Sequence, residues 1–70
     1  MIFDYEQLRM ARRAKKMHQA DVAALVNRTS TAISNMETGR VMVTADMLAL
    51  LCGIYGVNIN VFFAERIDER

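Results

Sequence analysis

Short hydroxyl and amide side chains crowd one stretch of the chain, NRTSTAISNMETGR, which runs from Asn27 to Arg40. Inside it Ile33 and Met36 stand three positions apart, which is the spacing of one helical face. The remaining face carries small polar residues: Ser30, Thr31, Ser34 and Asn35. Such groups donate and accept hydrogen bonds and let a helix approach a polar surface closely. This face is therefore the first candidate for a binding surface.

Two turn signals place this helix beside the preceding one. A helix is predicted to begin at Gln19 and to end at Asn27, because Asn adopts the left-handed conformation more readily than other non-glycine residues. Thr29 is then a good N-cap for a helix over residues 30–38, which ends at Gly39. The connection is so short that the two helices must cross steeply, at roughly 90–120°.

A steep crossing needs a small residue where the two axes approach. Ala23 is in that place, and Ile33 and Met36 are its apolar partners on the second helix. This is a helix-turn-helix arrangement, in which the second helix projects and can enter the major groove of DNA.

Helices are also predicted on both sides of this pair. The first covers about residues 5–16 and begins with a capping box formed by Asp4 and Gln7. Another begins after Thr44, a favourable N-cap, and ends at Gly56.

The last predicted helix is short, from Ile59 to Arg66, with Asn58 as its cap and with Phe62 or Phe63 buried. No segment reads as a convincing strand, and there is no proline, repeat or linker. The 70 residues therefore predict one compact all-α domain of five helices over positions 1–70.

Charge is distributed unevenly although the net charge is only +1. Residues 9–40 hold seven basic and two acidic side chains, whereas the rest of the chain holds two basic and six acidic ones. Such asymmetry is typical of a protein with one phosphate-facing side, but a solvated basic helix would give the same count.

Several classes of protein are disfavoured by features that the sequence lacks. The longest apolar run, from Met47 to Val57, is shorter than the roughly 20 residues that span a bilayer, and the N-terminus does not resemble a signal peptide. A lone Cys52 among apolar neighbours suits a buried thiol in a reducing compartment. No nucleophile–base pair, glycine-rich phosphate loop or metal cluster is recognisable, so we expect neither an enzyme nor a cofactor.

Residues 19–40, QADVAALVNRTSTAISNMETGR, resemble the helix-turn-helix of the phage repressor and Cro type, also called the XRE family. The similarity includes Gln19 at the start, Ala23 at the crossing and METGR at the end, and it extends over about residues 5–63. The resemblance implies a lambda-repressor-like fold with its motif at about residues 19–38. It also implies a transcriptional regulator that reads the major groove, and a repressor is the favoured kind.

Three positions depart from the family pattern. Asn27 replaces the usual turn glycine, and Arg28 replaces an apolar residue, so that its guanidinium can reach a phosphate. The apolar residues 41–43 replace a more polar loop. They would serve either as additional core or as part of a dimer contact.

The resemblance assigns DNA contacts residue by residue. Four residues on the exposed face of the second motif helix are expected to contact bases: Ser30, Thr31, Ser34 and Asn35. Residues around both helix starts and at the end of the motif are expected to contact phosphates: Lys16, His18, Gln19, Arg28, Thr29, Thr38 and Arg40. His18 has no second metal-ligating residue at a suitable spacing, so no metal site is expected there.

Arg12 and Glu37 have a different expected role. By resemblance they form an ion pair between the first helix and the end of the recognition helix, and this pair orients the recognition helix. The alternative is two separate solvated charges.

The expected partner is double-stranded DNA carrying a palindromic operator, bound by a homodimer. The protein is expected to be encoded by a bacterium or a phage and to lie in the cytoplasm, associated with the nucleoid. The dimer surface would lie in residues 55–70 or in residues 41–43. The alternative is a protein-interaction module, such as an antitoxin or antirepressor subunit that holds a protein partner on the same scaffold.

Overall fold

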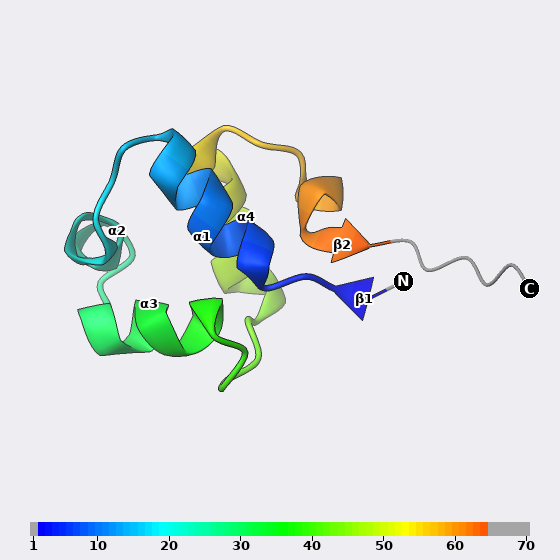
Figure 1. Ribbon diagram of the computed structural model, residues 1–70. Coiled ribbons are helices and arrows are strands. Elements are labelled where there is room, and N and C mark those ends of the chain that lie inside the picture. Colours follow the sequence, from blue (N-terminus) through cyan, green and yellow to red (C-terminus); the bar gives the residue numbers. More distant parts are fainter. Residues whose placement is uncertain (1, 65–70) are drawn as a thin grey trace, which may run out of the picture.

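A computed structural model of the chain describes residues 2–64, and within them α-helices dominate (Figure 1). The four α-helices are α1 (Glu6–Ala14), α2 (Gln19–Leu25), α3 (Ser30–Glu37) and α4 (Ala45–Tyr55). A 3-10 helix, η1 (Ile59–Phe62), follows α4. The two ends of the described chain meet in a small antiparallel sheet of β1 (Ile2–Phe3) and β2 (Phe63–Ala64).

The predicted fifth α-helix is wrong, and so is the prediction of a fold without strands. In place of a helix over residues 59–66 the structure has the single turn η1 and then β2, while residues 65 and 66 lie outside the described part. Two successive aromatic residues explain the difference, because η1 ends at Phe62, the ladder with β1 begins at Phe63, and both rings lie near Phe3. Phe62 is fully buried in the core, whereas Phe63 packs edge-on against Phe3 with ring centroids 5.5 Å apart.

The ends of the motif helices are confirmed. Asn27 has φ +58° and Gly39 has φ +78°, so both adopt the left-handed conformation expected of them. The Thr29 hydroxyl accepts a hydrogen bond from the Ala32 N–H at 3.1 Å, which caps α3. An added Cβ on Gly39 would lie 2.5 Å from Cε2 of Tyr5, so space as well as backbone geometry requires glycine.

The ends of α4 agree with the prediction, and those of α1 do so only in part. Thr44 accepts from the Met47 N–H at 3.2 Å, and Gly56 has φ +66°. At α1, however, the Asp4 carboxylate accepts from the Glu6 N–H at 3.2 Å, and no capping box with Gln7 forms. The helix ends at residue 14, close before Lys16, which is itself left-handed with φ +57°.

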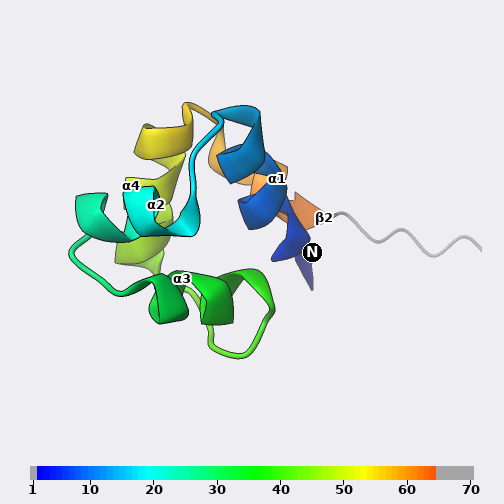
Figure 2. The ribbon, with the colours of Figure 1, turned by 60° about the vertical axis from the view of Figure 1, so that its left-hand side comes forward.

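The core lies where the inner faces of the four helices meet and is closed by Phe62. Leu8, Val22 and Ile33 are at most 2% exposed, and Ala23 of α2 is buried as well, at 4%. In both ribbon views α3 lies along one side of the molecule, with α1, α2 and α4 on its other side (Figures 1 and 2). None of the described helices is long and apolar enough to cross a membrane.

Candidate nucleic-acid interface

The rotation of α3 about its axis decides which side chains face outward. Ile33, Met36 and Glu37 are buried against the rest of the protein. Ser30 and Thr31 are consequently exposed, and Ser34 and Asn35 are partly exposed. The four residues expected to contact bases therefore share the accessible side of one helix.

The outer side of α3 carries no acidic group, because its one acidic residue, Glu37, faces inward. Glu37 is 6% exposed and Arg12 of α1 is 8% exposed. Two parallel hydrogen bonds join them, Arg12 Nε to Oε2 at 2.8 Å and Arg12 Nη2 to Oε1 at 3.0 Å. This bidentate arrangement is the strong form of an arginine–carboxylate contact. It pairs the one negative charge of α3 and holds it away from the outer surface.

The same ion pair anchors two further segments. The Gln19 side-chain amide donates to Glu37 Oε1 at 3.1 Å, and Arg12 Nη1 donates to the Met17 carbonyl at 3.0 Å. The network therefore ties α1, the start of α2 and the end of α3 together. Hydrogen bonding to Glu37 raises the pKa of Arg12 against the opposing effect of burial, so its guanidinium stays charged. The sequence pointed to Gln19 only as a phosphate contact and gave no sign of this bond.

The residues expected to contact phosphate occupy different settings. Lys16, His18 and Arg40 are exposed, and the His18 N–H donates to the Asp21 carboxylate at 2.8 Å. The Thr38 hydroxyl donates to the Ser34 carbonyl at 2.9 Å, and Thr29 serves as the cap described above. Within residues 2–64 no group of three metal-ligating side chains comes together, at His18 or elsewhere.

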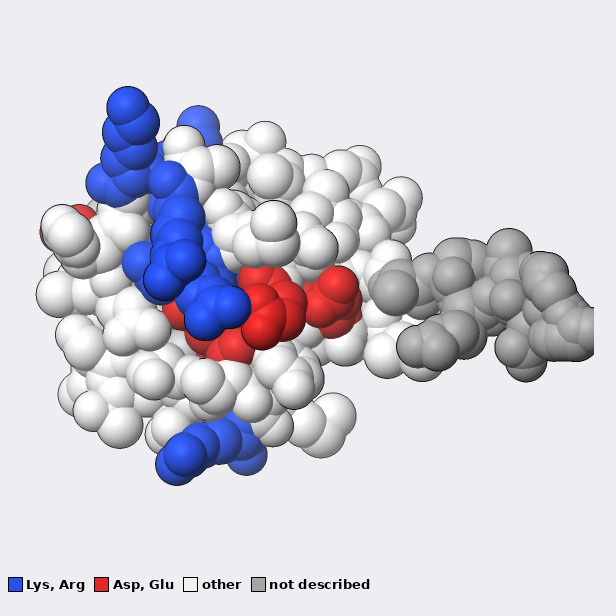
Figure 3. All heavy atoms as spheres, in the orientation of Figure 1, with Lys and Arg blue, Asp and Glu red and all other residues white. Residues whose placement is uncertain are grey.

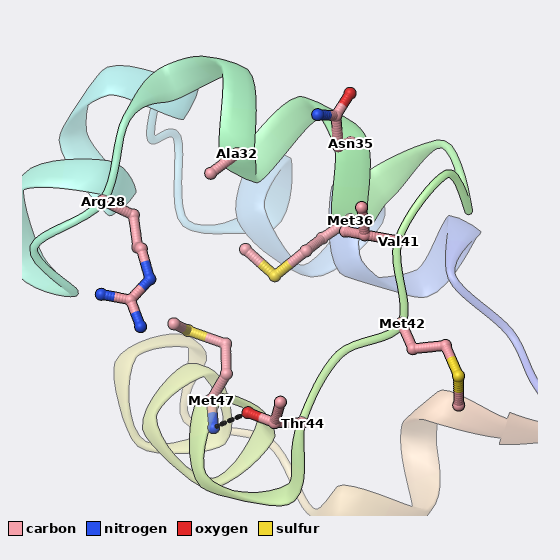
Figure 4. Close-up of a pocket in the computed structure, with 8 residues that line it drawn as sticks. All are labelled: Arg28, Ala32, Asn35, Met36, Val41, Met42, Thr44 and Met47. Carbon is pink, nitrogen blue, oxygen red and sulfur yellow. Dashed lines mark hydrogen bonds between the residues drawn. The ribbon is translucent and has the colours of Figure 1, made fainter.

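Arg28 is placed differently from the others. It lines a hollow of about 240 Å³ between α3 and α4, together with Met36 and Met47. Figure 4 shows its guanidinium directed toward Met47 rather than along the outer side of α3. Arg28 is nevertheless exposed, and the sequence did not show that its side chain would line this hollow.

Basic side chains gather on the face of the molecule that shows α1 and α3 (Figure 3). Lys and Arg form a ridge over α1, and a second basic group lies below α3. Acidic side chains adjoin the lower end of the ridge, and the surface between them and the second basic group carries no charged side chain in this view. Within α1 itself, Arg9 pairs with Glu6 at 2.6 Å. Cationic groups on both sides of the uncharged outer side of α3 match a duplex, whose phosphates flank a groove of base edges.

Tyr55 of α4 interacts electrostatically with both members of the ion pair, Arg12 and Glu37. The residue is 3% exposed, and burial, with a smaller effect from the Glu37 carboxylate, raises its pKa to about 12. Half-buried Cys52 shows the same effect of burial, which raises the pKa of its thiol. In both residues the fold favours the neutral form.

The raised pKa of Tyr55 predicts a loss of stability in alkali. The neutral phenol is favoured in the fold, so the stabilisation is complete below pH 10 and is lost as the pH rises toward 12. We expect about 1 kcal/mol less free energy of unfolding at pH 11 than at pH 9 from this group. Urea unfolding of the wild type and of Tyr55→Phe at both pH values isolates the contribution of Tyr55, because all other titratable groups are the same in the two proteins. An equal loss in the two proteins would contradict the prediction.

Comparison with known protein families agrees with this geometry. Residues 6–60 match a family described as helix-turn-helix domain, which covers most of the chain. The chain therefore belongs to this family of helix-turn-helix domains, and membership indicates a DNA-binding regulator. No curated protein and no solved structure matches the chain.

Proposed function

We propose that this protein is a sequence-specific transcriptional regulator of the repressor and Cro type, which represses by occupying an operator. In this proposal α3 enters the major groove, and the side chains on its exposed face read the bases: Ser30, Thr31, Ser34 and Asn35. Asn pairs bidentately with adenine, Ser and Thr bond several bases, and the Thr methyl contacts the methyl group of thymine.

One observation carries this proposal: the outer side of α3 is small, polar and free of negative charge. Glu37 would repel phosphates if it faced outward, but its carboxylate is paired with Arg12 at 2.8 Å and is nearly inaccessible. Because that carboxylate is paired and inaccessible, the outer side of α3 can approach a polyanion without like-charge repulsion.

Phosphate contacts in this proposal come from exposed groups around α3. Lys16 and His18 lie beside the start of α2, Thr29 precedes α3, and Thr38 and Arg40 follow it. Gln19 is partly buried and bonded to Glu37, so it joins the phosphate-binding side to the ion pair. Such contacts fix the register of the protein on DNA without reading its sequence.

A homodimer on a palindromic site is part of the proposal, because one helix of two turns reads few base pairs. Selection of bound duplexes from a random-sequence pool tests this. We expect enrichment of a palindrome whose half-sites lie about 10–10.5 bp apart, centre to centre. Enrichment of a single unrepeated half-site would contradict the dimer, and no enrichment would contradict sequence-specific reading.

A second candidate function is supported by the loop between α3 and α4. Val41 is 46% exposed and Met42 is 92% exposed. Two consecutive exposed apolar side chains favour a contact with another protein. The alternative is therefore an interaction module that binds another protein chain. Two results together favour the module: the wild type binds no DNA at low salt, and substitution of both residues by Ser abolishes binding of the protein partner.

A further inference from the structure

The hollow between α3 and α4 has walls that are mainly apolar. Ala32 and Met36 contribute from α3, Met47 from α4, and Val41 from the connecting loop. Its volume is about 240 Å³, which is room for roughly eight water molecules. This is slightly below the size of sites for drug-like ligands, which begin at about 300 Å³. A small molecule with an apolar body fits such a space.

Arg28 provides the charge in this hollow. Its guanidinium points toward Met47, between α3 and α4 (Figure 4). Within the part of the chain that the structure describes, no carboxylate lies within ion-pair distance of Arg28, and the one hydrogen bond of its guanidinium is from Nη1 to the Asn27 carbonyl at 3.2 Å. A guanidinium has five N–H donors in a planar fork, so Arg28 retains donors that can bind both oxygens of a carboxylate.

The other polar groups of the hollow, Thr44 and Asn35, form no hydrogen bond with Arg28 that would compete with a ligand. The Thr44 hydroxyl oxygen already accepts from the Met47 N–H at 3.2 Å. The Asn35 amide points away from the hollow, on the outer side of α3 (Figure 4). The hollow thus combines an apolar wall with one directed cation, which is complementary to a molecule with an apolar body and one anionic end.

We propose that the hollow between α3 and α4 binds a small monocarboxylic acid, with its aryl or short alkyl group among Met36, Met47 and Val41 and its carboxylate on Arg28. Binding does not require the proposed function. An effect on DNA does rest on it: Ala32 and Met36 belong to α3, so a ligand wedged behind that helix changes operator affinity.

The test uses the whole protein and two probe acids, naphthalene-2-carboxylate and octanoate, each beside its neutral primary amide. Calorimetry gives the affinities, and the methyl NMR signals of methionine give the location. The variants are Arg28→Gln, which keeps the length of the stem but not the charge, and Arg13→Gln, which removes an exposed cation of α1. Circular dichroism shows whether each variant is folded.

At least one acid is expected to bind with a Kd on the order of 1 mM or tighter, as a dozen ligand atoms allow. It should bind about tenfold more tightly than its amide, with shifts of the Met36 and Met47 methyl signals. Arg28→Gln should abolish the preference for acid over amide, whereas Arg13→Gln should keep it.

Three results would overturn the proposal: no saturable binding of either acid, equal binding of acid and amide, or shifts away from Met36 and Met47. If Arg28→Gln weakens binding to all duplexes and neither acid binds, Arg28 contacts the phosphates of the DNA backbone instead. If an acid binds as expected but no DNA is bound, the result supports the ligand site and contradicts the proposed function.

Discussion

Glu37→Ala is expected to lower the free energy of unfolding by about 3 kcal/mol or more, and the melting temperature by more than about 10 °C. The substitution leaves the Arg12 guanidinium 8% exposed and without its partner, and it also removes the acceptor of the Gln19 amide. An uncompensated buried charge costs far more than an exposed pair is worth. Thermal and urea unfolding measure the loss.

Two comparisons make this prediction specific. Glu6→Ala breaks the exposed pair with Arg9, whose side chains are 41% and 53% accessible, and should cost less than about 1 kcal/mol. The double variant Arg12→Met/Glu37→Leu replaces the buried pair by apolar groups and should recover most of the stability. If Glu37→Ala costs no more than Glu6→Ala, the buried pair does not form as described.

Phe62→Ala is expected to have an effect of similar size, about 3–5 kcal/mol. Phe62 is 0% exposed and precedes β2, so its loss opens a cavity in the core and frees the small sheet. The Asp4 N–H, which donates to the Phe62 carbonyl at 2.6 Å, would also lose a fixed partner. Urea unfolding at neutral pH measures the change.

Ile59→Ala provides a control within the same element. Ile59 is 44% exposed, so truncation there should change stability by less than about 1 kcal/mol. Equal small effects at both positions would mean that the closing segment is not docked into the core. A large effect at Phe62 alone agrees with the structure.

The parts of the fold that were predictable are those decided by local chemistry. Thr29 and Thr44 cap helices because a hydroxyl can reach the first free N–H groups, and Asn27 and Gly39 end helices because both tolerate positive φ. A few neighbouring residues are enough to decide such features. The helix-turn-helix itself followed from two such ends and the small Ala23 between them.

The parts that were not predictable depend on contacts between distant segments. The closing segment had an N-cap at Asn58 and was therefore predicted to be helical, but pairing of Phe63 with Phe3 selects a strand. The capping box at Asp4 failed for the same reason, since the Asp4 N–H is taken by the Phe62 carbonyl. Tertiary hydrogen bonds overrode a local signal in both cases.

Side-chain directions in the candidate site show the same division. The exposed positions of Ser30 and Thr31 followed from helical periodicity, because the buried residues fix the rotation of α3. The bond from Gln19 to Glu37 and the direction of Arg28 could not be read from the sequence, because each depends on a second helix.

The central claim is that α3 reads base sequence, and one binding measurement tests it most directly. Wild type and Thr31→Ala/Asn35→Ala are titrated with the selected operator and with random-sequence duplex over a series of salt concentrations. We expect the wild type to prefer the operator by about 10³-fold or more. The variant should lose most of that preference, at about 1–3 kcal/mol for each lost base contact, and keep the same dependence on salt. A folded variant that keeps the full preference, or a wild type that binds neither duplex at low salt, would contradict the claim.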